Sequence, residues 1–402
     1  MGLPLTGISA TSGVMFILRT FILMMLTILP ARAEARGWTL PDGSTLQAQI
    51  TGIHDGKVAL TPVNGKTPIE VPAASLKAPD RAVVAEWVPP GRRQAGANST
   101  VQRNAGGWPL TVTLKEDPAT TVVEENRAER RFIYRSDHFE FHCTQRLNGE
   151  VVLEFSRLFE VTFETVAALP LRLAPEPPRG YWRIVLYPTK PEYFAAGGPE
   201  GSGGLFRGST GEVMVPLPNL GVERAGQRWI MKNREGNQPL IHEVTHQVMG
   251  SWLTVLPVWL VEGSAEYLAA ARYTTGKLTL HASFDNMFTF LTEQKGISDR
   301  DIDLRHPKRL MVMSLEKWAS DLASREGLKN YYSSMLLFYY FSHLEGDGNG
   351  RALIDYFQAR PGSKTPDNDT MERDRLLLRG RSWDALWDDV LRAFAGIKIR
   401  LS

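Results

Sequence analysis

Hydrophobic and polar positions are spaced differently along the chain, with strand-like runs in the first half and helical runs in the second. Between residues 34 and 88, β-forming or alternating runs occur at Gln47–Ile50, Val58–Thr61 and Ile69–Val71, separated by Gly, Asn and Pro. A period of two is typical of strands, and Asn64-Gly65 between the last two runs is a hairpin signal. A series of such short strands predicts a small β-barrel.

Residues 89–107 have a different composition, rich in Pro, Gly, Arg, Asn and Ser with few apolar side chains. This composition predicts a linker. We therefore expect a second, larger domain over residues 108–402.

The larger domain begins with strand patterns and continues with helical ones. Strands are expected at Phe132–Tyr134, Phe139–Cys143 and Trp182–Tyr187, and apolar residues recur at helical spacing from Val151 to Val166. After Asn237 the pattern is mostly helical. Strands first and helices later indicate an α+β fold.

Charge and cysteine content exclude several classes of function. The 402 residues carry 46 Lys+Arg against 44 Asp+Glu without a long basic run, so nucleic acid is not an expected partner. Cys143 is the only cysteine, which excludes a disulfide framework and a cysteine-based zinc ribbon. Its place in an apolar strand pattern favours a buried structural thiol.

The N-terminal residues 1–33 have the order of a secretory signal peptide. Arg19 precedes an apolar run, Phe21–Leu29, which is followed by small residues up to Ala33. The pattern predicts export to the periplasm or the extracellular space, with cleavage near Ala33. The apolar run is too short to span a bilayer comfortably, so membrane attachment is expected only if this segment stays uncleaved.

The sequence His242-Glu243-Val244-Thr245-His246 is typical of a metal site on a helix. Residues four apart lie on one helical face, so His242 and His246 can direct ring nitrogens at one ion. Glu243 projects beside them, where it could take a proton from an activated water.

A third protein ligand has to come from elsewhere in the chain. The metzincin class needs a third His where Trp252 stands, so that class is excluded. A helix starting at Pro257 supplies Glu262, with Glu266 one turn further on the same face. Glu262 is the first choice of ligand, and Glu266 is the alternative.

Together these two segments resemble the gluzincin superfamily of zinc metallopeptidases, whose third ligand is a Glu on the following helix. The run from Trp259 to Tyr267 is similar to the aminopeptidase-N family and, more closely, to the peptidase-MA-like bacterial families. The spacing from His246 to Glu262 is shorter than in the aminopeptidase-N family, and that family's Gly-Ala-Met-Glu-Asn type of motif is lacking. The closer likeness extends to Ser136–Phe141, Ile184–Tyr187, Gly204–Val215 and Tyr331–Phe341. The first domain resembles SH3-like modules at the front of exported bacterial proteins.

This resemblance implies a zincin-like domain, with a small mixed sheet that ends in an edge strand, an active-site helix and a helical C-terminal part. It implies one Zn²⁺ held by His242, His246 and Glu262. Glu243 would be the general base for peptide-bond hydrolysis, and Glu266 would hydrogen-bond a ligand His from outside the coordination shell.

Two further features of the expected active site follow from the same resemblance. The donor to the developing oxyanion would be Tyr331, with Tyr332 as the second choice. A peptide or protein substrate would add to an edge strand formed by Glu212, Val213, Met214 and Val215.

Other polar residues are given structural interpretations. His138 and His142 lie too far apart along one strand to share an ion, so both are expected to be satisfied structural histidines. His343 is a weaker candidate for the oxyanion donor and is expected to lie in the core or on a helix surface. The segment from Glu345 to Gly350 resembles the start of a calcium loop but lacks its closing Glu, and is expected to be a polar loop.

A second hypothesis is a binding or scaffolding protein of the cell envelope. It would keep the zinc-binding zincin fold without catalysis, and the N-terminal barrel would supply recognition. Nothing in the motif is degraded, which favours the enzyme. The sequence specifies neither the substrate nor an oligomeric state.

Overall fold

The computed structural model describes residues 35–402 apart from 55–56, 64, 66, 87–93, 178–179, 201, 227, 233–236, 281–283, 298–299, 323 and 361–365. It divides into two compact units, Met1–Arg81 and Ala82–Ser402. The predicted signal peptide, residues 1–33, lies outside the described residues. Among the described helices, none combines the length and the apolar character needed to cross a membrane.

The first unit is an antiparallel sheet of four strands followed by a helix. Its elements in chain order are β1 (Arg36–Thr39), β2 (Thr45–His54), β3 (Lys57–Pro62), β4 (Ile69–Pro72), the 3₁₀ turn Ala73–Ser75 and α1 (Ala78–Glu86). The buried Trp38 donates from Nε1 to the carbonyl of Ala48 at 2.9 Å. Asp80 accepts hydrogen bonds from Arg36 and from the backbone of Thr39, which ties α1 to β1.

The three predicted strands of this unit are confirmed within β2, β3 and β4, whereas the predicted barrel is not confirmed. The strand order β1-β2-β3-β4 is an open meander, and in the described residues no pairing joins β1 to β4. Both outer strands have four residues. Closing a sheet into a barrel requires its two outer strands to pair with each other, so this sheet is open rather than closed.

The second unit is built around a mixed sheet of six strands. Its strands are β7 (Thr121–Asn126), β8 (Arg131–Arg135), β9 (Phe139–Cys143), β10 (Trp182–Tyr187), β11 (Leu205–Arg207) and β12 (Glu212–Pro216). The order is β11-β12-β10-β9-β8-β7, with β10 parallel to both neighbours and the other pairs antiparallel. The strands predicted at β8, β9 and β10 and the mixed sheet are confirmed.

The position of the edge strand corrects the sequence-based prediction. β12, with Glu212, Val213, Met214 and Val215, pairs with β11 on one side and β10 on the other, so it is an interior strand. Val213, Met214 and Val215 are fully buried, as expected for a strand covered on both faces. The outer strand at this end of the sheet is β11, which contacts α4. A short turn around Gly211 connects β11 to β12.

A second sheet of four strands contains part of the predicted linker. Its order is β15-β16-β6-β5, with β5 (Ser99–Arg103), β6 (Pro109–Leu114), β15 (Arg272–Thr274) and β16 (Lys277–Thr279). β5 lies inside the range 89–107, so the folded unit begins before Trp108. The polar composition of β5 resembles a linker, and pairing with β6 is what makes it a strand. Two small ladders complete the sheets: β13 (Val222–Ala225) with β14 (Arg228–Met231), and β17 (Asp301–Ile302) with β18 (Arg400–Leu401).

Helix α2 (Gly149–Ala168) contacts β9 of the large sheet, β5, β6 and β16 of the second sheet, and helix α4. Its buried carboxylates bind neighbouring segments. Glu164 accepts hydrogen bonds from the backbone of Gly96 and the hydroxyl of Ser99. Glu160 accepts from Ser136 and from the backbone and Nδ1 of His138. These bonds offset the cost of burying two charges in the core.

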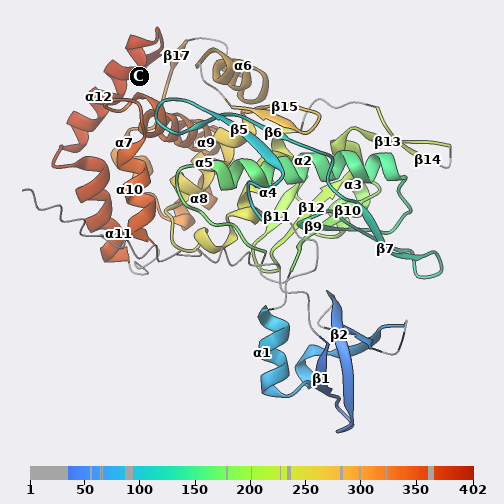
Figure 1. Cartoon of the computed structure of the whole chain (residues 1–402). Helices are drawn as coiled ribbons and strands as arrows, with labels where there is room; N and C mark the ends of the chain where they lie inside the picture. Colours follow the sequence, from blue (N-terminus) through green and yellow to red (C-terminus); the bar gives the residue numbers. More distant parts are fainter. Residues whose placement is uncertain are drawn as a thin grey trace, which may run out of the picture. The chain divides into compact units, whose positions relative to one another are not determined.

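Helices dominate the chain after β14, as predicted, and the β15–β16 hairpin is an exception. Figure 1 shows α7, α10, α11 and α12, in orange and red, together on one side of the unit. The helices are α3 (Lys190–Ala195), α4 (Gln238–Val248), α5 (Val258–Ala269), α6 (Phe284–Lys295), α7 (Pro307–Met311), α8 (Leu315–Asp321), α9 (Arg325–Tyr339), α10 (Arg351–Ala359), α11 (Pro366–Glu372) and α12 (Trp383–Gly396). Leu217–Leu220 and Gly250–Trp252 are 3₁₀ turns, and Tyr340–Leu344 and Arg373–Leu378 are π-helical segments. The whole is α+β.

A cluster around His343 joins α5 to the segment that follows α9. The hydroxyl of Tyr267 lies 2.8 Å from Nε2 of His343, and the Trp108 ring centroid is 5.3 Å from the His343 ring. Trp108 in turn donates from Nε1 to the carbonyl of Asn349, in the loop between Glu345 and Gly350. This bond attaches the loop to Trp108. Burial lowers the pKa of His343 to about 4, so the ring is neutral at neutral pH.

This low pKa predicts a pH-dependent stability. The unfolded chain binds a proton at His343 near pH 6.5 and the folded chain only near pH 4, so folding is weakened as the pH falls through that window. We expect the melting temperature of His343→Gln to fall less steeply than that of wild type between pH 7 and pH 4.5. Equal slopes in a thermal melt series would contradict the prediction.

Candidate metal centre

Helix α4 places one face in the core and the other in the site. Leu240, Ile241, Val244 and Val248 are buried at helical spacing. Gln247, also buried, donates from Nε2 to the carbonyls of Arg183 and Gly211, both at 2.8 Å. These bonds attach α4 to β10 and to the turn before β12. The opposite face presents His242, Glu243 and His246.

Helix α5 begins after Pro257, as predicted, and directs Glu262 and Glu266 at α4. Helix α9 packs closely against α5 at Gly263. A Cβ added to Gly263 would lie 2.6 Å from the carbonyl oxygen and 3.0 Å from the carbonyl carbon of Ser334. Glycine at 263 therefore lets the two helix backbones approach closely.

Three predicted ligand atoms meet at one point. Nε2 of His242 and Nε2 of His246 are 2.9 Å apart, and Oε2 of Glu262 lies 3.4 Å from the first and 3.5 Å from the second. A tetrahedral zinc ion with bonds near 2 Å separates its ligand atoms by about 3.3 Å. The three distances lie on both sides of that value, so the three atoms can occupy three of the four ligand positions of a tetrahedral zinc ion.

The surroundings of Glu262 point to a bound cation as well. Its Oε2 is buried and has no hydrogen-bond partner among the residues that the structure describes. Such an acceptor is costly to bury unless a cation or a donor satisfies it. An ion among the three ligand atoms would do so. His242, His246 and Glu262 form the one group with this geometry in the described part of the chain.

The electrostatics of the cluster are dominated by its carboxylates. Burial alone would lower the pKa of His242, but Glu262, Glu266 and Glu243 together raise it to about 9. Burial alone would raise the pKa of Glu262, yet the two imidazoles hold it far below its ordinary value. Without an ion the cluster therefore attracts positive charge. A metal ion would replace the proton on His242, because a ligand imidazole must be neutral.

Glu266 occupies the outer position that the resemblance implied. Its Oε1 lies 3.5 Å from Nδ1 of His242, on the opposite side of the ring from the ligand nitrogen. A carboxylate there favours the tautomer with the proton on Nδ1 and leaves Nε2 available to bind a metal ion. The alternative of Glu266 as the third ligand is disfavoured by this geometry.

Glu243 is held by the edge strand. Its Oε2 accepts a hydrogen bond of 2.6 Å from the backbone N–H of Phe206 in β11. The chain also passes close to its stem, since a Cβ at Gly204 would lie 3.5 Å from Cγ of Glu243. The carboxylate is thereby fixed in the helical turn that carries both imidazoles.

The two adjacent tyrosines of α9 point in different directions. The Tyr331 ring centroid lies 6.2 Å from that of His242 and 5.3 Å from that of Trp318. Burial, together with the nearby carboxylates, raises its pKa far above the ordinary value, so Tyr331 keeps its proton. Tyr332 donates its hydroxyl to the carbonyl of Asp303 at 2.9 Å, and burial raises its pKa to about 12. Tyr331 therefore faces the site, and Tyr332 does not.

The remaining histidines of the sequence analysis are structural. His138 is buried against Glu160, with Nδ1 2.6 Å from a carboxylate oxygen. His142 binds Glu140 through Nε2 at 2.5 Å. Cys143 is buried, as predicted, and burial raises the pKa of its thiol to about 11.

Sequence reasoning missed three parts of the site. The backbone N–H of Phe206 carries no side-chain signal. Trp318 lies on a separate helix, and only the fold brings it to Tyr331. Gly263 did leave a signal, because an isolated glycine inside a helical pattern often marks a close packing contact.

No protein-family model and no curated protein sequence matches this chain. Function has to be inferred from the chemistry of the site itself.

The contact at Gly263 yields a stability prediction. We expect Gly263→Ala to lower the free energy of unfolding by about 1–3 kcal/mol, because the backbone of Ser334 must move to admit a methyl group. The matched control is Gly396→Ala, at the exposed end of α12, where an added Cβ meets nothing within 4 Å. The control should be neutral or stabilising by up to about 1 kcal/mol. Equal effects in urea unfolding would argue against the proposed tight crossing.

Proposed function

We propose that the protein is an exported zinc-dependent metallopeptidase. The observation that supports this most is the meeting of Nε2 of His242, Nε2 of His246 and Oε2 of Glu262 at the edge lengths of a tetrahedral zinc site. Glu243, on the same helical turn, supplies a positioned base. Export rests on the signal-like order of residues 1–33.

Zinc held by these three residues would supply a Lewis acid, which makes water nucleophilic near neutral pH and polarises a peptide carbonyl. Glu243 takes the proton of the attacking water and passes it to the leaving amine. Tyr331, protonated and adjacent to His242, donates a hydrogen bond to the oxyanion. Glu266 keeps the His242 ring oriented throughout. The resulting reaction is peptide-bond hydrolysis.

Metal content and hydrolysis test the proposal together. We expect one zinc ion per chain in wild type, its loss in His246→Ala and Glu262→Ala, and its retention in Glu243→Gln. Hydrolysis of a peptide pool by wild type should be abolished in Glu243→Gln, because the amide cannot accept the proton. Elemental analysis and mass spectrometry of the pool measure the two properties.

The outcomes separate the enzyme from the idle scaffold considered above. Wild type without zinc would refute the metal centre. Stoichiometric zinc with no cleavage of any peptide would refute the peptidase and favour a zinc-binding envelope protein. Hydrolysis that persists in Glu243→Gln would show that another group is the base.

The tyrosine pair offers a matched test of the oxyanion donor. Tyr331→Phe should lower kcat by about 10²–10³-fold with little change in KM, because its hydrogen bond forms mainly in the transition state. Tyr332→Phe removes a hydroxyl that binds Asp303 and should leave kcat within about twofold of wild type. Equal kinetics for the two variants would remove Tyr331 from the mechanism.

A further inference from the structure

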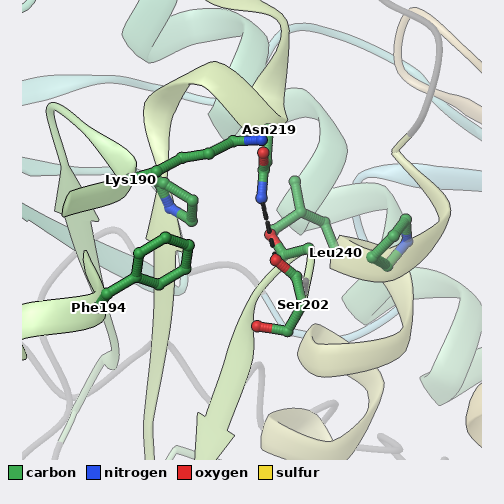
Figure 2. Close-up of a pocket in the computed structure, with 8 residues that line it drawn as sticks. Lys190, Phe194, Ser202, Asn219 and Leu240 are labelled. Carbon is green, nitrogen blue, oxygen red and sulfur yellow. Dashed lines mark hydrogen bonds between the residues drawn. The ribbon is translucent and has the colours of Figure 1, made fainter. Parts of the chain in front are cut away.

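A pocket of about 300 Å³ lies beside the start of α4. Figure 2 shows Lys190 and Phe194 on one side, facing Asn219, Ser202 and Leu240. Pro216 and Pro239 complete the apolar part of its wall. The metal centre uses none of these residues.

The backbone segment from Gly203 to Phe206 contacts both the pocket and the metal centre. A Cβ at Gly203 would lie 2.4 Å from Cβ of Pro239, which lines the pocket, and one at Gly204 would lie 3.5 Å from Cγ of Glu243. Two residues on, Phe206 donates to Glu243 and its ring lies 6.4 Å from the His246 ring. The segment from Gly203 to Phe206 therefore runs along α4 in the same direction as the helix, from the pocket to His242 and His246.

The spacing places the pocket one or two substrate residues from the metal. Pro239 and Glu243 are four residues apart on one face of α4, which is about 6 Å along the helix axis. An extended peptide advances about 3.3 Å per residue. Antiparallel pairing, the more stable arrangement, directs the C-terminal end of a peptide on β11 toward Gly203. The pocket then lies on the C-terminal side of the cleaved bond.

The side-chain chemistry of the pocket favours an anion. Both amide hydrogens of Asn219 are used, since its Nδ2 donates to the carbonyls of Ser202 and Gly203. The hydroxyl of Ser202 is paired with Tyr193 and the carbonyl of Pro199. The remaining side-chain donor in the lining is the ammonium group of Lys190. Among the residues that the structure describes, no carboxylate forms a salt bridge with it.

Figure 2 shows the Lys190 side chain extended over the pocket, with its end toward the amide of Asn219. The amide oxygen of Asn219 can orient the ammonium group, while Phe194 and Leu240 supply apolar walls for a methylene stem. A stem ending in a carboxylate would satisfy both parts of the lining.

We propose that this pocket binds a carboxylate of the peptide substrate, on the first or second residue after the cleaved bond. This proposal rests on the proposed peptidase function and specifies its substrate class. The carboxylate has two sources: the side chain of Asp or Glu, or the C-terminus of the peptide. The first makes the enzyme an endopeptidase with acidic preference, and the second makes it release short C-terminal fragments.

Binding to the zinc-loaded Glu243→Gln protein tests the pocket without turnover. The probes are fluorescent degenerate peptide pools with one position fixed as Glu or Gln, each made with a free and an amidated C-terminus. We expect a carboxylate at the right position to tighten binding about tenfold to hundredfold, as measured by fluorescence anisotropy. Tightening by fixed Glu in amidated pools identifies the side chain, and loss on amidation alone identifies the chain terminus.

Further substitutions in the Glu243→Gln protein test whether Lys190 causes the preference for a carboxylate. Lys190→Gln should abolish the preference, and Lys190→Glu should reverse it, so that the Gln pool binds more tightly than the Glu pool. The matched control is Lys308→Gln, which removes an exposed lysine from the first turn of another short helix and should leave the preference intact. A preference that survives in Lys190→Gln would overturn the assignment.

The pocket and the peptidase fail in distinguishable ways. If wild type cleaves all pools and neither binding nor turnover depends on a carboxylate, the proposed carboxylate site is refuted and the proposed peptidase function is retained. Carboxylate-dependent binding that requires Lys190, without cleavage by zinc-loaded wild type, would support the pocket as a peptide site and overturn the peptidase. If no pool binds, the proposal that this pocket binds a substrate carboxylate is refuted.

Discussion

The burial of Glu262 and Glu266 against the imidazoles of α4 is the interaction on which the arrangement of the helices depends. Both carboxylates are largely withdrawn from water, and each lies within about 3.5 Å of a nitrogen of His242. Isolated buried carboxylates are costly, so α5 is stable in this place only with positive charge between it and α4. A proton on His242 supplies part of that charge, and a divalent cation would supply more.

This electrostatic requirement is consistent with glycine at two close approaches to the site. On one side, Gly263 lets α9 approach α5 until the backbone of Ser334 touches it, which brings Tyr331 to His242. On the other side, Gly204 fits between the carbonyl of Met214 and the stem of Glu243. A side chain at Gly263 would push apart two helices that have to converge, and one at Gly204 would shift the carbonyl of Met214 by a few tenths of an ångström.

Local patterns predicted the parts of this arrangement that depend on local periodicity. The pairing of His242 with His246, and the placing of Glu262 before Glu266, follow from helical spacing, and β8, β9 and β10 follow from apolar alternation. The errors are all nonlocal. β5 is too polar to be recognised without β6, and β12 is interior because β11 pairs outside it. The tyrosine choice depended on the direction of one helix face, which only the packing of α9 on α5 decides.

In the proposed peptidase, the hydrogen bond from Phe206 to Glu243 would link substrate alignment to proton transfer. β11 has three residues, and the central one turns its N–H away from β12 toward the base. A peptide lying along this edge would therefore be in register with the base, because both are positioned by the same residue. Residues of β11 alternate in direction, so a shift of the strand by one residue would take the N–H of Phe206 away from Glu243. The same shift would move Gly203 away from Pro239. The same backbone segment thus contacts both Glu243 and the wall of the pocket beside Lys190.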